Sequence, residues 1–372
     1  MMKAPLIRLF TTAAVFVAVK VSAPVVAQTE FEAELPAFST APSTNEATRS
    51  LPEAVRLTDL RPVWQQVNRC AAAALAIQMS YFGWSGTYDE VIRYLNSHPE
   101  DVAVRLEEMG AFAELHGLRW IARFGGTVDL LKLLIAEGFP VLIENSYYDG
   151  PGGFRDWMSH NRVMMGYDDA QGLLYAFDSL LGNGPDGQGR PFEYADIEER
   201  WRPFNRDYLL LYHPEDEDRV RGLLGEDHWD PVRNAELALA QSQAEIDEGR
   251  ADSYTYFNIG TSLLVLERYE EAAEAFDIAR RTGLPWRMLW YQYGPFEAYY
   301  QVGRYDDVIA LARQVIDTTP GVEETYYYIG LAAEALGETQ RAIANLEVAV
   351  MRNTNFTEAI EALARLRGAQ AN

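Results

Sequence analysis

The chain contains a single cysteine, Cys70, among residues whose types could support thiol chemistry. In the stretch "WQQVNRCAAAALAIQMSYFG", residues 64–83, a polar run precedes the cysteine and an apolar run follows it. This pattern predicts a helix that begins at Cys70, where unpaired N–H groups and the helix dipole favour the reactive thiolate. The alanines at 71–74 would keep bulk away from the sulfur, so that a substrate backbone could approach it. Upstream, either Gln65 or Gln66 could join the Cys70 N–H in an oxyanion hole for acyl transfer.

A thiol nucleophile also needs a base, and His160 has a suitable position for that role. It stands at the start of one strand of a predicted hairpin in "DWMSHNRVMMGYDDAQGLLYAFDSL", and Asp178 ends the partner strand. The entry of one strand lies beside the exit of its antiparallel neighbour, so Asp178 could hold the imidazole ring and fix its tautomer. The other histidines fall in a turn, at a helix end, after the last strand or in an acidic segment: His98, His116, His213 and His228. In the alternative interpretation, Cys70 is a small buried hydrophobe, which is the usual state of a lone cysteine.

The segments "QQVNRCAAAALAIQMSYFG", "PVLIEN" and "SHNRVMMGYD…YAFDS" closely resemble the papain-like cysteine peptidases of the bacteriocin-leader, or double-glycine, type. These peptidases form family thirty-nine of the cysteine peptidases, and the chain is most similar to their stand-alone exported relatives. The resemblance spans about residues 60–214 and includes the tail "RWRPFNRDYLLLY". It implies that Cys70 is the nucleophile and His160 its base. Asp178 would be the orienting carboxylate, and either Gln65 or Gln66 the oxyanion donor.

The sequence departs from that family in two respects. The family usually has Gly-Pro-Ala after the cysteine, whereas this chain has three alanines and lacks the proline that fixes the helix start. The transporter-fused members cleave double-glycine leaders. Because no transporter accompanies this sequence, we do not expect that specificity here.

These candidate residues need a framework, and residues 51–215 predict an α+β domain. The stretch "TVDLLKLLIAEG" predicts a helix, with Thr127 as its N-cap and Gly138 just past its end. Apolar runs bounded by turn residues predict strands, which are 139–145, 162–168, 173–179 and 208–212. Residues 28–50 are rich in Ser, Thr, Ala, Pro and Glu and predict a flexible linker. The run "PEDEDR" predicts an acidic linker over 216–230.

Residues 231–372 have continuous helical periodicity and an internal repeat. Aligning "RYEEAAEAFDIA", "RYDDVIALARQV" and "ETQRAIANLEVA" places Ala272, Val308 and Ala342 at equivalent positions, 36 and 34 residues apart. This spacing predicts an all-α domain of tetratricopeptide-like repeats over roughly 252–356, with capping helices on both sides. The first and third units carry the expected small and apolar residues, which are Tyr256, Ile259, Gly260, Ala272, Phe276 and Ala279, then Tyr326, Ile329, Gly330, Ala342 and Ala349. The middle unit departs from the pattern at Pro295 and Phe296.

The repeat region is also rich in tyrosine, a residue type common at binding surfaces. The tyrosines concerned are Tyr254, Tyr256, Tyr291, Tyr293, Tyr299, Tyr300, Tyr326, Tyr327 and Tyr328. Stacked helix pairs present a concave groove. We therefore expect these side chains either to bind a partner or substrate there, or to pack the repeats against one another.

The charge balance is strongly acidic, with 32 Lys and Arg against 55 Asp and Glu and a formal net charge of −23. Nucleic acid and anionic membrane surfaces are therefore not expected as partners. No cluster of residues has metal-ligand spacing, and "GNGPDGQGR" lacks the lysine and the strand–helix context of a phosphate loop. The sequence accordingly predicts neither a metal nor a cofactor.

Residues 1–27 have the features of a secretory signal. Lys3 and Arg8 form its positive region, a short apolar core follows, and Val-Val-Ala precedes Gln28. Lys20 interrupts the apolar run, which makes a permanent membrane span the weaker alternative. We therefore expect a periplasmic or extracellular protein with no stable membrane span after cleavage. One cysteine cannot form an intramolecular disulfide there, so the thiol is either inert or kept for its chemistry.

These observations together predict an exported cysteine peptidase-like protein. It would hydrolyse a peptide or isopeptide bond, and its repeats would recruit a peptide or protein substrate or another protein partner. Two alternatives remain. In one, the papain-like domain is a catalytically idle scaffold for a repeat-based binding module. In the other, the same thioester is transferred to an amine instead of to water.

Overall fold

The computed structural model describes residues 50–148 and 157–370. The predicted signal segment, and the predicted linker up to residue 49, lie outside the described residues. Within the described part, one antiparallel sheet has the strand order β2-β7-β3-β4-β5-β6, and β1 pairs with β4. The strands are β1 Ala54–Arg56, β2 Arg119–Arg123, β3 Val141–Tyr148, β4 Trp157–Asp168, β5 Leu173–Phe177, β6 Arg190–Glu193 and β7 Tyr208–Tyr212.

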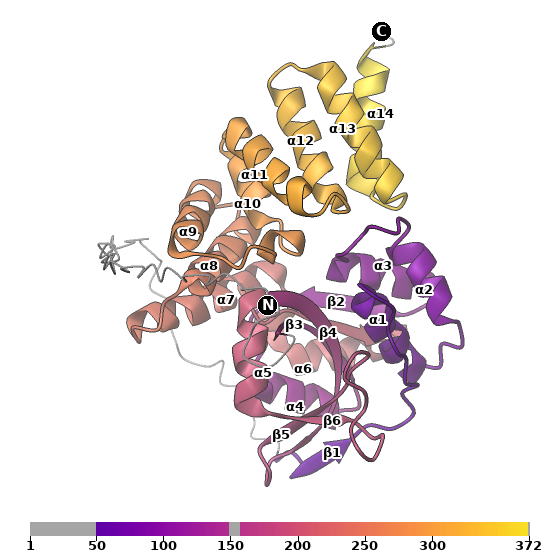
Figure 1. Ribbon diagram of the computed structural model, residues 1–372. Coiled ribbons are helices and arrows are strands. Elements are labelled where there is room, and N and C mark those ends of the chain that lie inside the picture. Colours follow the sequence, from indigo (N-terminus) through magenta and orange to yellow (C-terminus); the bar gives the residue numbers. More distant parts are fainter. Residues whose placement is uncertain (1–49, 149–156, 371–372) are drawn as a thin grey trace, which may run out of the picture. The chain divides into compact units, whose positions relative to one another are not determined.

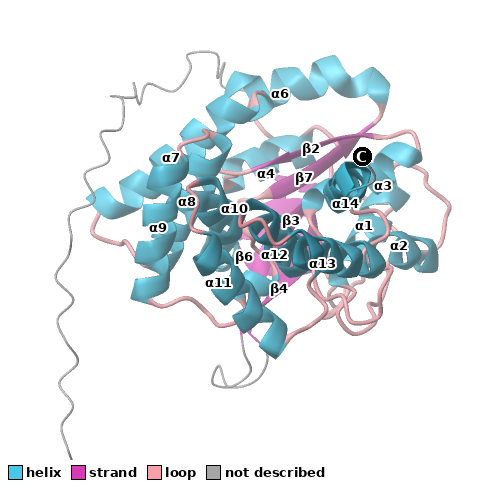
Figure 2. Ribbon diagram, turned by 90° about the horizontal axis from the view of Figure 1, so that it is seen from above, coloured by secondary structure: helices cyan, strands magenta, loops and turns pink. Residues whose placement is uncertain are grey.

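Helices cover both faces of this sheet (Figure 1 and, with the strands in magenta, Figure 2). They are α1 Cys70–Tyr81, α2 Tyr88–Leu95, α3 Leu106–Leu115, α4 Val128–Ala136, α5 Tyr194–Trp201 and α6 Glu217–Trp229. One core joins α1, α2 and α3 to sheet residues that include Val163 and Leu209. The other joins α4, α5 and α6 to residues that include Met164 and Leu210. Successive residues of a strand point to opposite faces, so each strand contributes to both cores.

Helix α1 is buried around its whole circumference, since every residue from 71 to 80 is buried. A helix of this composition belongs in the interior of a domain. The alanines at 71–74 are only 0–7% exposed. That they keep bulk away from the sulfur for a substrate stays a prediction. Their small side chains also allow α1 to pack closely with α2 and β4.

The local sequence signals placed several elements correctly. Thr127 Oγ1 accepts the Leu130 N–H at 3.0 Å, which is the predicted N-cap of α4, and Gly138 follows the helix with a φ of 90°. Strand β7 covers the predicted residues, whereas β4 begins earlier than predicted because it continues to pair with β3 as far as Trp157. Strands β1, β2 and β6 were not predicted.

The segment 216–230, expected to be an acidic linker, contains helix α6. Val220 and Leu224, one helical turn apart, are buried in the core between α6 and the sheet. The neighbouring acidic residues Glu217 and Asp218 are exposed. The segment is therefore an amphipathic helix of the first domain, and its charges occupy the solvent face.

The chain continues into an all-α region of stacked helices, as predicted. They are α7 Pro231–Asp247, α8 Ser253–Val265, α9 Tyr269–Thr282, α10 Gly294–Gln301, α11 Tyr305–Thr318, α12 Glu323–Ala335, α13 Thr339–Arg352 and α14 Thr357–Gln370. A Cβ on Gly260 would lie 2.7 Å from Phe276, and one on Gly330 would lie 2.8 Å from Leu346. Glycine at these repeat positions therefore lets paired helices pack closely. No helix of the described ranges is long and apolar enough to cross a membrane.

The fold is thus an α+β domain followed by stacked helices with the predicted repeat spacing. The middle repeat differs from its neighbours in structure as well as in sequence. Helix α10 has 8 residues, whereas α8 and α12 have 13 each. The short 3-10 helix η3, Met288–Trp290, precedes α10 and contacts β4. The residues that would complete a full-length helix therefore lie against the sheet of the first domain.

Hydrogen bonds join the repeats to the first domain at both ends of the stack. The 3-10 helix η1, Arg202–Phe204, follows α5, and its Arg202 pairs with Glu245 of α7 at 3.0 Å. At the other end, the Asn353 amide donates to Glu108 of α3 at 2.7 Å. A third contact is a close approach of backbones, because a Cβ on Gly321 would lie 1.8 Å from the Glu100 carbonyl oxygen.

We expect the substitution Gly321→Ala to weaken this docking. The added methyl group cannot fit against a backbone atom, so one of the two segments must shift, at a cost of about 1–3 kcal/mol. Urea unfolding should show the loss, and amide exchange should rise around Glu100. Gly222→Ala is the control, because a Cβ on Gly222 meets nothing within 4 Å. Unchanged stability and exchange in Gly321→Ala would contradict the close approach.

Candidate functional site

Cys70 is the first residue of α1, as the sequence predicted. The residue before it fixes this helix start, because the buried Arg69 guanidinium donates to the carbonyl groups of Asn68, Pro99 and Asp101 at 2.7–3.0 Å. The first N–H groups of a helix have no acceptor within it. The thiol is partly exposed. It is therefore held at a position where the backbone can stabilise negative charge.

His160 lies on β4, and its ring is bound to Asp178. The distance from His160 Nε2 to Asp178 Oδ1 is 3.0 Å, and the two residues are 2% and 1% exposed. Burial lowers the pKa of His160. The hydrogen bond and charge of Asp178, and then those of Cys70, raise it by more, so the pKa of His160 lies above its usual value. Nε2 is taken by the carboxylate, which leaves Nδ1 as the ring nitrogen available to a second partner. The structure thus brings His160 and Asp178 into direct contact, and Cys70 raises the pKa of His160.

Asp178 also accepts hydrogen bonds from groups that sequence reasoning missed. Arg162 Nε donates to Oδ2 at 2.8 Å, and the N–H groups of Leu180 and Leu181 donate to Oδ1 at 2.8 and 2.7 Å. Burial raises the pKa of Asp178, but His160 and Arg162 lower it to a net position well below its usual value. Arg162 is two residues from His160 on the same strand face, so the alternation of β4 contained the signal for it.

The two candidate glutamines have different surroundings. Gln65 Oε1 accepts from the Ser179 hydroxyl at 2.8 Å, and the Gln65 N–H donates to the Ser179 carbonyl at 3.1 Å. Gln65 is therefore tied to the residue that follows Asp178, and its amide NH₂ remains available as a donor. The Gln66 side chain is exposed, and its backbone N–H donates to the Tyr88 hydroxyl at 3.0 Å.

Asn161 is a second residue that the sequence analysis missed. Its Oδ1 lies 3.6 Å from Cys70 Sγ, and its buried Nδ2 has no hydrogen-bond partner among the described residues. Rotation of the amide by half a turn would exchange these two atoms, so the same side chain can accept from a thiol or donate to a thiolate. Nothing in the sequence except its place beside His160 pointed to it.

Buried acidic groups continue this polar region along β3. The Ser159 hydroxyl donates to the Glu144 carboxylate, and the Glu144 N–H donates to Asp207 Oδ1 at 3.2 Å. Burial raises the pKa of Glu144 to about 7. Burial, and then the charge of Glu144, raise the pKa of Asp207 well above its usual value. Of the described residues, no group of His, Cys, Asp and Glu is placed to hold a metal ion.

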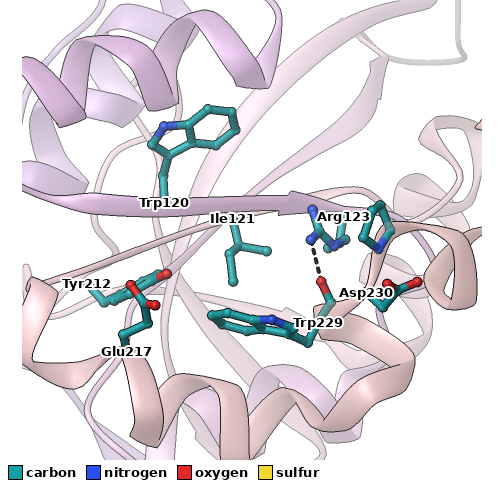
Figure 3. Close-up of a pocket in the computed structure, with 8 residues that line it drawn as sticks. Trp120, Ile121, Arg123, Tyr212, Glu217, Trp229 and Asp230 are labelled. Carbon is teal, nitrogen blue, oxygen red and sulfur yellow. Dashed lines mark hydrogen bonds between the residues drawn. The ribbon is translucent and has the colours of Figure 1, made fainter.

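Two cavities lie near the sheet, and they differ in their relation to the thiol. A cavity of about 680 Å³ is lined by Glu144 and Asp207, and by residues of the repeats that include Tyr291. Burial, followed by the charge of Cys70, raises the pKa of Tyr291, which places this tyrosine within electrostatic range of the thiol. The second cavity, of about 320 Å³, is shown in Figure 3, where Arg123 donates to the Trp229 carbonyl. None of the predicted site residues lines it.

No protein-family model and no curated protein matches the sequence. Three solved structures are similar to parts of it. A C39-like peptidase from Bacillus anthracis is 15% identical over 43% of this chain and 98% of its own, with a TM-score of 0.35. A double-glycine motif protease from an AMS/PCAT transporter, in complex with its leader peptide, is 16% identical over 42% of this chain and 93% of its own, with a TM-score of 0.31. MamA from Desulfovibrio magneticus RS-1 is 17% identical over 37% of this chain and 77% of its own, with a TM-score of 0.33.

We expect Glu144→Gln to be more stable than the parent chain at pH 8. The folded protein holds the Glu144 proton up to about pH 7, whereas the unfolded chain loses it near pH 4.3. The stability from this group is therefore present below about pH 4.3 and lost as the pH rises through 7, a loss of about 1–3 kcal/mol. Urea midpoints should favour Glu144→Gln at pH 8 and converge towards pH 4.5. The control, Glu53→Gln, lies at an exposed position, and an equal pH trend in it would contradict the prediction.

We expect native Cys70 to react with iodoacetamide at pH 6 about tenfold faster or more than an ordinary thiol, which is almost fully protonated there. Because it is the only cysteine, total labelling reports on it alone. His160→Ala should slow the reaction by removing the cationic partner, and Asp178→Asn should slow it less. His116→Ala, at an exposed position, should change nothing. A thiol that reacts only after unfolding, with no effect of His160→Ala, would show that Cys70 only packs the core.

Proposed function

We propose that this protein is a thiol-dependent hydrolase that cleaves a peptide or isopeptide bond at Cys70. The observation that carries the proposal is the His160 ring, bound by Asp178 at 3.0 Å and raised in pKa by Cys70 as well as by Asp178. A ring fixed at Nε2 can take and return a proton at Nδ1 without losing its orientation.

In the proposed reaction, His160 takes the Cys70 proton, and the thiolate attacks the carbonyl carbon of the scissile amide. The negative charge that develops on the carbonyl oxygen is stabilised by the Cys70 N–H and by the Gln65 amide. Collapse of this intermediate breaks the C–N bond, and His160 protonates the departing amine. A water molecule then gives its proton to His160 and attacks the thioester, which releases the carboxylic acid and restores the thiol.

Each supporting residue has a stated role in this scheme. Asp178 is a positioning residue because it acts through His160, and Arg162 positions Asp178 in turn. Gln65 is favoured over Gln66 as the oxyanion donor because Ser179 ties it to the Asp178 segment. The buried Nδ2 of Asn161 supports a further contact, a hydrogen bond to the thiolate after the amide turns.

The proposal also covers how the substrate is recruited and where the protein acts. The repeats would hold the peptide or protein substrate, because tyrosines at 291, 293, 300, 327 and 328 line the large cavity. Tyr299 has the packing role instead, since it is fully buried and its hydroxyl donates to Asp277 at 2.6 Å. Export to the periplasm or the cell exterior remains a prediction from residues 1–27.

Incubating the chain from Gln28 onward with a peptide library, and identifying the products by mass, tests the reaction. Cys70→Ala and His160→Ala should abolish cleavage. Gln65→Ala should lower kcat about 10²–10³-fold, which is the usual effect of removing an oxyanion donor. Gln66→Ala is the matched control and should leave kcat nearly unchanged.

The products also distinguish the two alternatives. Free carboxylic acids indicate hydrolysis, whereas amides formed with an added amine indicate acyl transfer from the same thioester. Peptide binding without any Cys70-dependent product would indicate an idle scaffold, and the proposed activity would be wrong.

A further inference from the structure

The larger of the two cavities described above has walls from both domains. Strand β3 contributes Glu144, the residue before β7 is Asp207, and α3 contributes Glu107. The repeats contribute Glu297 of α10 and the aromatic rings that precede and follow it. At about 680 Å³ the cavity has the size of a ligand site.

Its charges are unbalanced. Six carboxyl groups line it against two guanidinium groups, and the carboxyls are Glu107, Glu144, Asp207, Glu297, Glu324 and Glu358. Both guanidinium groups are already engaged. Arg105 lies within 3.6 Å of the carboxylates of Glu324 and Glu358. Arg123 donates to backbone carbonyl groups, including that of His228 at 3.0 Å.

Four of the carboxyls form no ion pair within 4.0 Å with a described residue: Glu107, Glu144, Asp207 and Glu297. The side chain of Glu297 also forms no hydrogen bond with a described residue, and burial raises its pKa. Burial is the largest cause that raises the pKa of Glu144 and of Asp207, and the charge of Glu107 is a smaller cause in the same direction. Acidic groups that are costly to ionise in the empty cavity would be stabilised by a cation inside it.

The rest of the lining suits a cation with an apolar stem. Tyr300, Tyr327 and Tyr328 line the same cavity as Glu297, and aromatic faces attract ammonium and guanidinium groups. The methylene groups of a lysine or arginine side chain would pack against the same rings. The ring of Tyr291, on the cavity wall, lies 6.0 Å from that of Trp157 on β4, so the cavity lies beside the strand that carries His160.

We propose, on the basis of the function proposed above, that this cavity binds the protonated lysine or arginine side chain of a peptide substrate. The carboxylates hold the charge, and the tyrosines hold the stem. The carboxylates keep a bound lysine amine protonated. A protonated amine has no lone pair with which to attack a thioester. The cavity therefore serves recognition, and the cation it binds is not an acyl acceptor.

Binding can be measured apart from turnover with the full chain carrying Cys70→Ala. The probes are fluorescent hexapeptides of alanine and glycine with a single lysine at each position in turn, and matched peptides with norleucine or glutamate there. Anisotropy should show at least about tenfold tighter binding of the best lysine peptide than of its norleucine match, the effect of about 1.4 kcal/mol. Glu297→Gln should remove most of that difference, whereas Glu274→Gln, at an exposed position on α9, should preserve it.

The outcomes separate this proposal from the proposed activity. Three results would each overturn the cavity assignment, even if the parent chain hydrolyses peptides. They are equal binding of the lysine and norleucine peptides, tighter binding of the glutamate peptide, and a lysine preference that survives Glu297→Gln. Spermidine that binds as tightly as the lysine peptide, in competition with it, would make the ligand a free polyamine and overturn the peptide assignment. A lysine preference that depends on Glu297, in a chain that cleaves nothing, would support the cavity and reject the hydrolase.

Discussion

The carboxylate of Asp178 is buried at the end of β5, and a buried anion must be compensated by donors that the fold holds in place. Four donors meet it, from His160, Arg162, Leu180 and Leu181. The donors come from two segments, so the carboxylate fixes the imidazole ring on β4 and the turn after β5 at once. Ser179 in the same turn donates a hydrogen bond from its hydroxyl to Gln65 Oε1. The geometry at the thiol therefore depends on this one buried charge.

The parts of the site that could be predicted are those with local causes. A cysteine before an apolar run indicates a helix start, and the two ends of a hairpin indicate which residues lie side by side. Arg162 and Asn161 were missed because their roles depend on tertiary contacts, with Asp178 and with Cys70. Strand β2 was missed for a similar reason, since its partner β7 lies about ninety residues later in the chain. The buried pair Val220 and Leu224 did carry a helical signal, but the surrounding acidic residues concealed it.

The middle repeat shows how a departure from a pattern can carry information. In the first and third units, glycine lets long paired helices pack closely. In the middle unit, α10 begins late, and η3 before it contacts β4 instead of completing the helix. The shortened helix places Glu297 and Tyr300 on the wall of the cavity. The unit whose pattern is weakest in the sequence is thus one that contacts the first domain, through η3.

This adaptation makes the repeats part of the site and not a separate recruiting module. Arg105 of the first domain is shared by Glu324 and Glu358, which belong to the repeats and line the same cavity. Burial, and then the charge of Glu323, raise the pKa of Glu324 well above its usual value, so this end of the junction holds more buried acid than its cations compensate. Such a junction is not optimised for tight docking alone. An excess of acid beside an aromatic cavity is consistent with a surface selected to receive a cation, and the same groups then stabilise docking most when that cation is bound.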